Sequence, residues 1–178
     1  MSSAALSTYI ELLKSYNEHT NIYSKGAYHR LDFHLNDCQC LAALIQNQAC
    51  RVLDIGSGSG LPAVVLAICN PNNQIRAVES KSRKTRFLAH VKEQLSLHNL
   101  EIIQANIVEY ARKAVTKADV VTAKAYASLE KVEQVSRPLR HQKSVIWIPI
   151  SKLQAQNLNV KKSHVVQRDD FYYAKWQI

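Results

Sequence analysis

The pattern of apolar and polar positions predicts strands and helices that alternate along most of the chain. Short apolar runs of strand type cover residues 51–55, 75–79, 100–105, 119–123 and 144–148. Helical spacing of apolar residues covers residues 61–68, 82–98, 107–114 and 129–139. This alternation predicts an α/β fold with a mostly parallel sheet and helices on both faces.

The two ends of the chain depart from this alternation. Two helices are predicted at residues 4–16 and 31–45, and the first carries an apolar stripe of Leu6, Tyr9, Ile10 and Leu13. We expect them to form a helical cap, residues 1–48, on a sheet that spans residues 49–178. The length of 178 residues predicts a single domain, 1–178. Residues 163–167 and 171–177 predict a hairpin, and thus an antiparallel C-terminal edge.

Composition narrows the class of protein. Hydrophobic residues make up 47% of the chain and charged residues 21%, which argues against disorder. No stretch approaches the roughly 20 apolar residues of a membrane span, and no basic leader opens the chain, so we expect a cytoplasmic protein, and we take it to be a monomer. The four cysteines show no CxxC spacing and predict reduced, packed thiols without a metal. The net charge of +9 favours a polyanionic partner such as nucleic acid.

Glycine is concentrated at one point of the chain. Three of the four glycines, Gly56, Gly58 and Gly60, lie between the strand at 51–55 and the helix at 61–68. Glycine clusters where the backbone needs conformations closed to other residues. In doubly wound sheets ligands bind outside the carboxyl ends of the strands, so this loop is the first candidate for a binding site.

The spacing of this loop favours one cofactor over another. Its third glycine comes one residue too early for the dinucleotide pattern GxGxxG. Asp54 is expected to place a carboxylate at the mouth of the loop, where it would repel a pyrophosphate and hold a cation. S-adenosylmethionine, with its ammonium and sulfonium groups, is such a ligand. The cofactor-binding residues predicted in this segment are Asp54, Gly56, Ser57, Gly58, Gly60, Leu61 and Pro62.

Two later strand ends complete the predicted cofactor site. Glu79 ends the second strand, where a carboxylate can accept hydrogen bonds from the ribose hydroxyls. Nicotinamide cofactors require the same carboxylate, so Glu79 does not separate the two cofactors. Asn106 and Ile107 follow the third strand, where the amide is placed to bind the adenine edge or simply to face water.

Basic and aromatic residues near the same strand ends suggest an RNA substrate. Lys81, Arg83, Lys84 and Arg86 open the second helix with no acid among them, which suits phosphates or, equally, a solvated helix face. His34 has Asp37 one turn later, as a pair in the site or as ordinary packed residues. Lys124 and Tyr126 follow the fourth strand, where a lysine can donate to guanine O6 and a tyrosine can stack on a base, or both can serve packing alone.

With these motifs in order, the sequence resembles the RsmG (GidB) family, the 16S ribosomal RNA guanine-N7 methyltransferases. The resemblance rests on Asp54 to Pro62, Ser80 to Leu88, Lys124 to Leu129 and His34 to Asp37. It implies a Rossmann-like class I S-adenosylmethionine-dependent methyltransferase that acts on ribosomal RNA or the small ribosomal subunit. Guanine N7 has a free lone pair, so no general base is required and catalysis is mainly positioning. In this reading, Lys124 and Tyr126 would be the catalytic residues.

The chain departs from the family pattern at several of these positions. Lys124 and Phe33 replace arginines, Ala63 replaces a glycine, and Ile148-Pro149 replaces a lysine-glycine pair. Two alternatives therefore stay open: a weakened or non-catalytic paralogue that binds RNA and cofactor, and a nicotinamide-dependent oxidoreductase.

Overall fold

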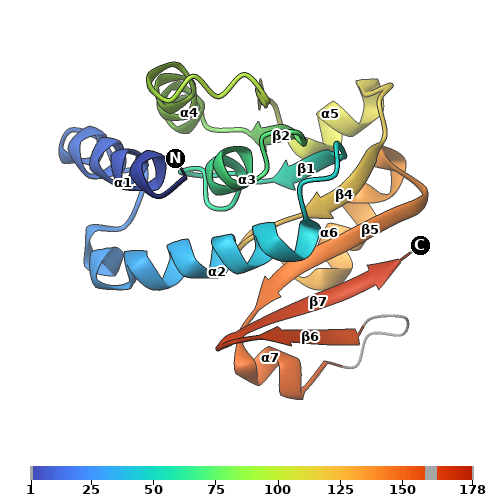
Figure 1. Cartoon of the computed structure of the whole chain (residues 1–178). Helices are drawn as coiled ribbons and strands as arrows, with labels where there is room; N and C mark the ends of the chain where they lie inside the picture. The colour runs from blue at the N-terminus through green and yellow to red at the C-terminus, as the bar shows by residue number, and fades with distance from the viewer. Residues whose placement is uncertain (1, 159–163, 178) are drawn as a thin grey trace.

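A seven-stranded sheet forms the centre of the computed structural model, which describes residues 2–158 and 164–177 (Figure 1). The strand order is β3-β2-β1-β4-β5-β7-β6. The strands are β1 (Arg51–Ile55), β2 (Gln74–Glu79), β3 (Leu100–Gln104), β4 (Ala118–Thr122), β5 (Arg140–Ile150), β6 (His164–Arg168) and β7 (Phe171–Gln177).

The order of the strands reverses beside β1. From β1 the chain moves outward through β2 to β3, then returns to place β4 on the other side of β1. Strands β1 to β5 are parallel, whereas β7 runs antiparallel to both β5 and β6. The expected α/β fold with an antiparallel edge is confirmed. The reversal between β1 and β4 is where ligands bind in doubly wound sheets.

Helices cover both faces of this sheet. The helices are α1 (Ser2–Glu18), α2 (Leu31–Ile45), α3 (Ala63–Cys69), α4 (Ser82–Gln94), α5 (Ile107–Lys113), α6 (Leu129–Ser136) and α7 (Lys152–Gln156), with short 3-10 helices η1 (Lys25–Arg30) and η2 (Arg137–Leu139). One apolar cluster joins α1 to α4 with the sheet, and a second joins α5 and α6 with the opposite face.

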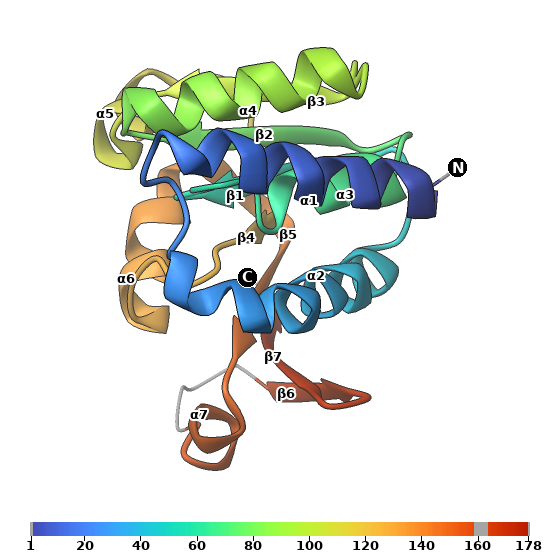
Figure 2. The same ribbon diagram turned by 90° about the vertical axis from the view of Figure 1, so that its left-hand side faces the viewer.

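The expected helical cap packs mainly on other helices. Helix α1 lies along α3 and α4, and α2 lies on α3 and β5 (Figure 2). Tyr9 and Leu13 of α1 are fully buried in the same cluster as Phe87 of α4 and Val52 of β1. The cap therefore touches the elements that carry the glycine loop.

Several element bounds differ from the sequence prediction. Helix α4 ends at Gln94 because Ser96 takes a left-handed conformation with φ 51°. Strand β5 begins at Arg140, four residues before the expected start. Helices η1 and α7 were not expected, although Ser151 and Gln154 form a capping box that marks the start of α7. The predicted strand residue 163 lies outside the described residues.

Within the described residues, the four cysteines are unpaired, with Cys38 fully buried. No group of histidine, cysteine or acidic side chains there could hold a metal ion. Among those same residues, no helix is long and apolar enough to span a bilayer.

Candidate active site

The glycine loop turns tightly from β1 into α3. All three glycines take positive φ angles: 72° at Gly56, 58° at Gly58 and 100° at Gly60. The Gly56 amide donates to the Val78 carbonyl at 2.9 Å and so ties the loop to the end of β2. At Gly60 an added Cβ would lie 2.5 Å from Val64 Cγ2, so only glycine lets the loop reach the helix this closely.

Glu79 is held by the backbone amides of the site. Its Oε2 accepts from the Gly58 amide at 2.9 Å, and its Oε1 accepts from the Lys81 amide at 2.8 Å. The side chain is 6% exposed. A longer bond of 3.4 Å comes from the Ser80 hydroxyl to Oε1. A carboxylate has about four acceptor positions, so these three bonds still leave acceptor capacity for a ligand.

A cavity of about 250 Å³ lies beside Glu79; we call it the loop cavity. It is lined by residues predicted from the sequence, namely Gly56, Glu79, Lys81, Lys84, Asn106, Ile107 and Tyr126. The Tyr126 ring lies against the glycine loop, because a Cβ added at Gly56 would be 2.5 Å from Tyr126 Cδ2. The ring thus covers part of the space over Gly56.

Asp54 does not lie where the sequence predicted. Its side chain is fully buried beneath the loop and does not line the loop cavity, so the expected position at the mouth is wrong. Strand alternation is the reason: Asp54 shares the face of Val52, which is covered by the cap helices. Neither carboxylate oxygen has a hydrogen-bond partner among the described residues.

The burial of Asp54 changes its protonation. Burial raises the pKa of this carboxyl to about 7, and the nearby Glu79 carboxylate adds to the rise. The neighbouring Ser57 hydroxyl and Ala63 amide oppose it, although neither forms a hydrogen bond to the carboxylate. The Ser57 hydroxyl itself donates to the Asp54 carbonyl at 3.1 Å. Ser57, Leu61 and Pro62 are buried and support the loop from below rather than lining the loop cavity.

Asn106 has a structural task as well as a place in the loop cavity. It caps α5, with its Oδ1 accepting from the Val108 amide at 2.9 Å. The Oδ1 is thus partly engaged, and the NH₂ group is left to donate to a ligand. Ile107, 5% exposed, supplies an apolar wall beside it.

The predicted basic residues divide into two groups. Lys81 and Lys84 line the loop cavity, and together with Arg83 they line an open groove against residues 18–25; we call it the cap groove. His19 and Lys25 stand on the opposite side of the cap groove. Arg86 is exposed but is not part of either lining.

A second cavity, of about 470 Å³, lies between α2 and the end of β5; we call it the α2–β5 cavity. His34, Asp37 and Lys124 line it, and Ala125 lines both this cavity and the loop cavity. A contact between His34 and Asp37, one of the two alternatives open from the sequence, does not form. Instead Asp37 pairs with Lys124, and the His34 Nδ1 is buried without a partner among the described residues.

Asp37 is fixed by residues from two distant parts of the chain. Besides Lys124, it meets the Tyr173 hydroxyl, which lies 2.9 Å from its Oδ1 and 2.8 Å from its carbonyl oxygen. The side chains of Lys124 and Asp37 are 16% and 7% exposed. In this arrangement Lys124 positions its loop and does not present a free ammonium group to a ligand.

Two contacts were missed in the sequence. Tyr9 of α1 donates to the Ser59 carbonyl in the glycine loop at 2.8 Å, and Tyr173 of β7 donates to Asp37. Both tyrosines are fully buried, and burial raises the pKa of each hydroxyl. The one indication in the sequence is a tyrosine, with its polar hydroxyl, at a position predicted to be buried. The hydrogen-bond partners themselves could not be predicted, because they lie 50 and 136 residues away.

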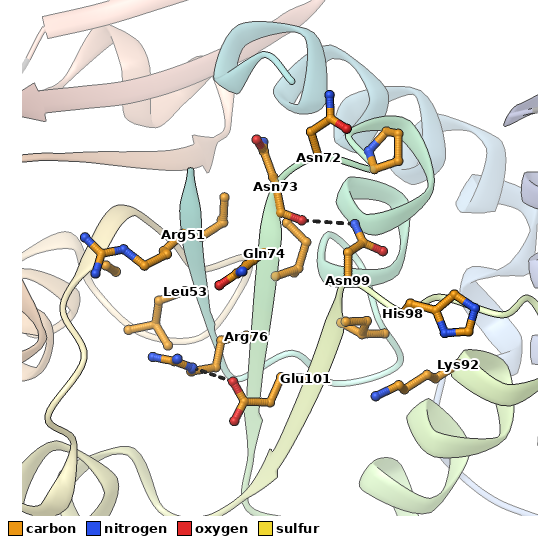
Figure 3. Close-up of a pocket in the computed structure, with 15 residues that line it drawn as sticks. Arg51, Leu53, Asn72, Asn73, Gln74, Arg76, Lys92, His98, Asn99 and Glu101 are labelled. Atoms are coloured by element: carbon orange, nitrogen blue, oxygen red, sulfur yellow. Dashed lines mark hydrogen bonds and ion pairs between the residues drawn. The ribbon is translucent and has the colours of Figure 1, made fainter. Parts of the chain in front are cut away.

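A further cavity of about 470 Å³ lies at the amino ends of the parallel strands, opposite the ends that carry the glycine loop (Figure 3). Arg51 and Arg76 line it, but Arg51 pairs with Asp119 and Arg76 with Glu101, each at 2.8 Å. These two arginines are thus paired with carboxylates, and the cavity lies at the opposite ends of the strands from the glycine loop.

The fold is that of the class I S-adenosylmethionine-dependent methyltransferases. Coclaurine N-methyltransferase, bound to N-methylheliamine and SAH, superposes with a TM-score of 0.59 at 18% identity over 79% of this chain and 43% of the enzyme. A predicted O-methyltransferase from Agrobacterium tumefaciens superposes with a TM-score of 0.65 at 11% identity over 79% of this chain and 80% of that protein. Within this class, the chain belongs to the GidB family, rRNA small subunit methyltransferase G, which matches residues 2–171.

Relatives named ribosomal RNA small subunit methyltransferase G align with the chain over different lengths. The protein from Brachyspira hyodysenteriae is 31% identical over 88% of this chain and 75% of its own length. The protein from Psychrobacter arcticus is 37% identical over 56% of this chain, and the protein from Marinomonas sp. is 31% identical over 74%. The chain spans 40% and 62% of the lengths of these last two relatives. The family resemblance expected from the four motifs is confirmed.

Proposed function

We propose that the protein transfers a methyl group from S-adenosylmethionine to small-subunit (16S) ribosomal RNA, at guanine N7. The observation that carries the proposal is the glycine loop whose Gly58 amide holds Glu79 beside the loop cavity. Membership of the GidB family supports the choice of ribosomal RNA as the substrate.

The residues around the loop cavity suit the cofactor. Glu79 retains acceptor positions for the ribose hydroxyls, and the Asn106 NH₂ group and Ile107 suit the adenine ring. A volume of about 250 Å³ is below the roughly 300 to 1,000 Å³ typical of ligand pockets. The Tyr126 ring must therefore turn away from Gly56 for the cofactor to enter.

The bound cofactor supplies an electrophilic methyl group on a sulfonium. Guanine N7 attacks through its own lone pair, so the protein needs to align the two reactants rather than remove a proton. Lys124 and Tyr126 act in this alignment. Lys124 anchors the segment after β4 through Asp37, and Tyr126 is exposed enough, at 39%, to meet both reactants after it turns.

The basic side chains suit the RNA backbone. Lys81, Arg83 and Lys84 on one side of the cap groove face His19 and Lys25 on the other, so phosphates could be held between them. Arg86 and His34 complete the proposed RNA-binding set. We propose the small ribosomal subunit or its RNA as the partner, met in the cytoplasm by a monomeric protein.

Transfer of labelled methyl groups tests the proposal. The protein is incubated with S-adenosylmethionine and with small subunits from a strain that lacks it. We expect one modified guanine per 16S RNA, located by the chain cleavage to which an N7-methylated guanine is prone. No incorporation, into either the subunit or its free RNA, would contradict the proposal.

A non-catalytic paralogue is the second candidate function. The Tyr126 ring over Gly56 favours it, because the ring occupies space that the cofactor would need. This candidate predicts binding of S-adenosylhomocysteine in a calorimeter together with no methyl transfer to any ribosomal substrate.

A further inference from the structure

The α2–β5 cavity lies directly beside the loop cavity. The two share Ala125, with Lys124 lining the α2–β5 cavity and Tyr126 lining the loop cavity. The α2–β5 cavity includes the carboxyl ends of β4 and β5, through Ala123 and Ile148. Its volume of about 470 Å³ is within the usual range for a site that encloses a small planar molecule.

An aromatic platform stands at the rim of the α2–β5 cavity. The Phe33 ring packs against Phe171 with centroids 5.0 Å apart, and the Arg30 guanidinium carbon lies 5.5 Å from the centre of the Phe33 ring. Phe33 remains 45% exposed. Phe33 and Tyr126 are the exposed aromatic side chains among the large hydrophobic residues that the structure describes, and both stand at this edge of the sheet. Tyr126 lines the loop cavity instead. Among the rings that line the α2–β5 cavity, Phe171 and Tyr172 are partly buried, and Phe33 is the most exposed.

The same cavity holds a polar group that lacks a partner. His34 lines it, and the buried His34 Nδ1 has no hydrogen bond among the described residues. Burial, and then the charges of Lys124 and Arg30, lower the pKa of His34, so its ring is neutral near pH 7. A neutral imidazole offers one donor and one acceptor, and a buried polar atom without a partner is unusual enough to require an explanation.

We infer that the α2–β5 cavity receives a purine base drawn out of its RNA stack, with Phe33 as the stacking face and His34 as a hydrogen-bonding partner. This inference rests on the proposed function, and it assigns the recognition of the base to residues of α2 rather than to Tyr126. Proteins that read RNA sequence commonly stack unpaired bases on aromatic rings and arginine planes, as Phe33 and Arg30 would do here. The cations Arg30 and Lys152 at the lining suit the phosphates that flank the base.

Steady-state kinetics on small subunits provides the first test. Stacking on an aromatic ring contributes enough that Phe33→Ala should raise the KM for the subunit about tenfold. The Kd for S-adenosylhomocysteine, measured by calorimetry, should stay at the wild-type value because Phe33 does not line the loop cavity. Phe33→Trp should restore the KM. Val165→Ala, at a residue of β6 that is 37% exposed and does not line the α2–β5 cavity, is the matched control and should behave as wild type.

Binding of guanosine monophosphate provides a second test that needs no catalysis. Saturation-transfer NMR, with S-adenosylhomocysteine present in excess, should show contact between the guanine protons and the wild-type protein. The contact should be lost in Phe33→Ala, retained in Phe33→Trp and Val165→Ala, and absent for ribose 5-phosphate.

The outcomes separate the inference from the proposed function. An unchanged KM in Phe33→Ala, an unchanged guanine contact in that variant, or equal contact with ribose 5-phosphate overturns the base site. If the wild type transfers no methyl group but guanosine monophosphate still binds through Phe33, the proposed function fails and the base site stands.

Discussion

Asp54 is the residue whose chemistry changes most between its expected and observed positions. The sequence predicted an exposed carboxylate at a ligand site. In the structure the Asp54 side chain is fully buried beneath the glycine loop and has no hydrogen-bond partner among the described residues. Its pKa is raised to about 7, so near neutral pH the folded protein carries it partly protonated. A buried acid of this kind makes stability depend on pH in an unusual direction.

We expect the free energy of unfolding to fall as pH rises from about 4 to about 7. In this interval the unfolded chain has released the Asp54 proton, whose ordinary pKa is 3.8, while the folded chain still holds it. The loss from this one group is on the order of 4 kcal/mol. Urea denaturation across this pH range measures it, and Asp54→Asn should remove most of the slope. Parallel pH profiles for the two proteins would contradict the burial of this acid.

The pair between Lys124 and Asp37 gives a second prediction at this scale. Lys124→Met leaves the Asp37 carboxylate buried without its cation, which should lower the free energy of unfolding by about 3 to 5 kcal/mol. Lys124→Arg keeps the cation and should lie close to wild type. Urea denaturation decides between them, and an equal loss in both variants would show that shape rather than charge matters at this position.

At the scale of elements, the turn from β1 into α3 depends on two glycines for different reasons. Gly60 combines a φ of 100° with atoms of Val64 and Leu88 that crowd the place of a Cβ. Gly58 has a φ of 58°, but its nearest neighbour there is the Lys84 Nζ at 3.7 Å, at the end of a flexible side chain. At Gly60 both the lack of space and the positive φ oppose a side chain, whereas at Gly58 only the positive φ does.

Alanine at these two positions should therefore have unequal effects. Gly60→Ala should lower the free energy of unfolding by about 2 to 4 kcal/mol, the sum of a clash and a left-handed backbone. Gly58→Ala should lower it by about 1 kcal/mol. Thermal and urea denaturation of both variants test the difference, and a larger loss at Gly58 would reverse our account of the turn.

The sequence predicted the elements better than the contacts between them. Periodicity located β1, α2 and β7 within a residue or two, because each has a clear apolar face. The residues around the loop cavity were also predicted, since parallel strands bring their carboxyl ends together. The position of Asp54 was wrong because it depends on which face of β1 the cap covers. The partners of Asp37 were missed because local spacing says nothing about a residue 136 positions away.

At the scale of the whole molecule, the net charge of +9 includes a group of basic side chains that line the cap groove. The cap groove gathers His19, Lys25, Lys81, Arg83 and Lys84, whereas Lys92, at the other end of α4, lines the cavity where the parallel strands begin. The two ends of one helix thus carry cations in different surroundings. The proposed function requires only the first end to meet RNA.

Salt dependence of RNA binding separates these two ends. Each phosphate contact contributes about 0.7 to 0.9 to the slope of log K against log salt concentration. The double variant Lys81→Gln, Arg83→Gln should therefore reduce the slope by about 1.4 to 1.8. Lys92→Gln, with the same change in type on the same helix, should leave it unchanged. Equal reductions per charge removed in the two proteins would show that binding responds to total charge and not to the cap groove.

The hydrogen bond from the Tyr173 hydroxyl to Asp37 also has a consequence for the order in which the chain folds during synthesis. Asp37 is synthesised early, but its partner Tyr173 lies in β7, 136 residues later in the chain. The hydrogen bond between them can therefore form only after β7 has been made. Before β7 pairs with β5, the nascent chain can form the glycine turn from β1, β2 and α3. It cannot yet form the contacts between Tyr173, Asp37 and Lys124. The residues around the loop cavity should therefore reach their final arrangement before those of the proposed base site, and a chain released before β7 is made should lack a complete base site.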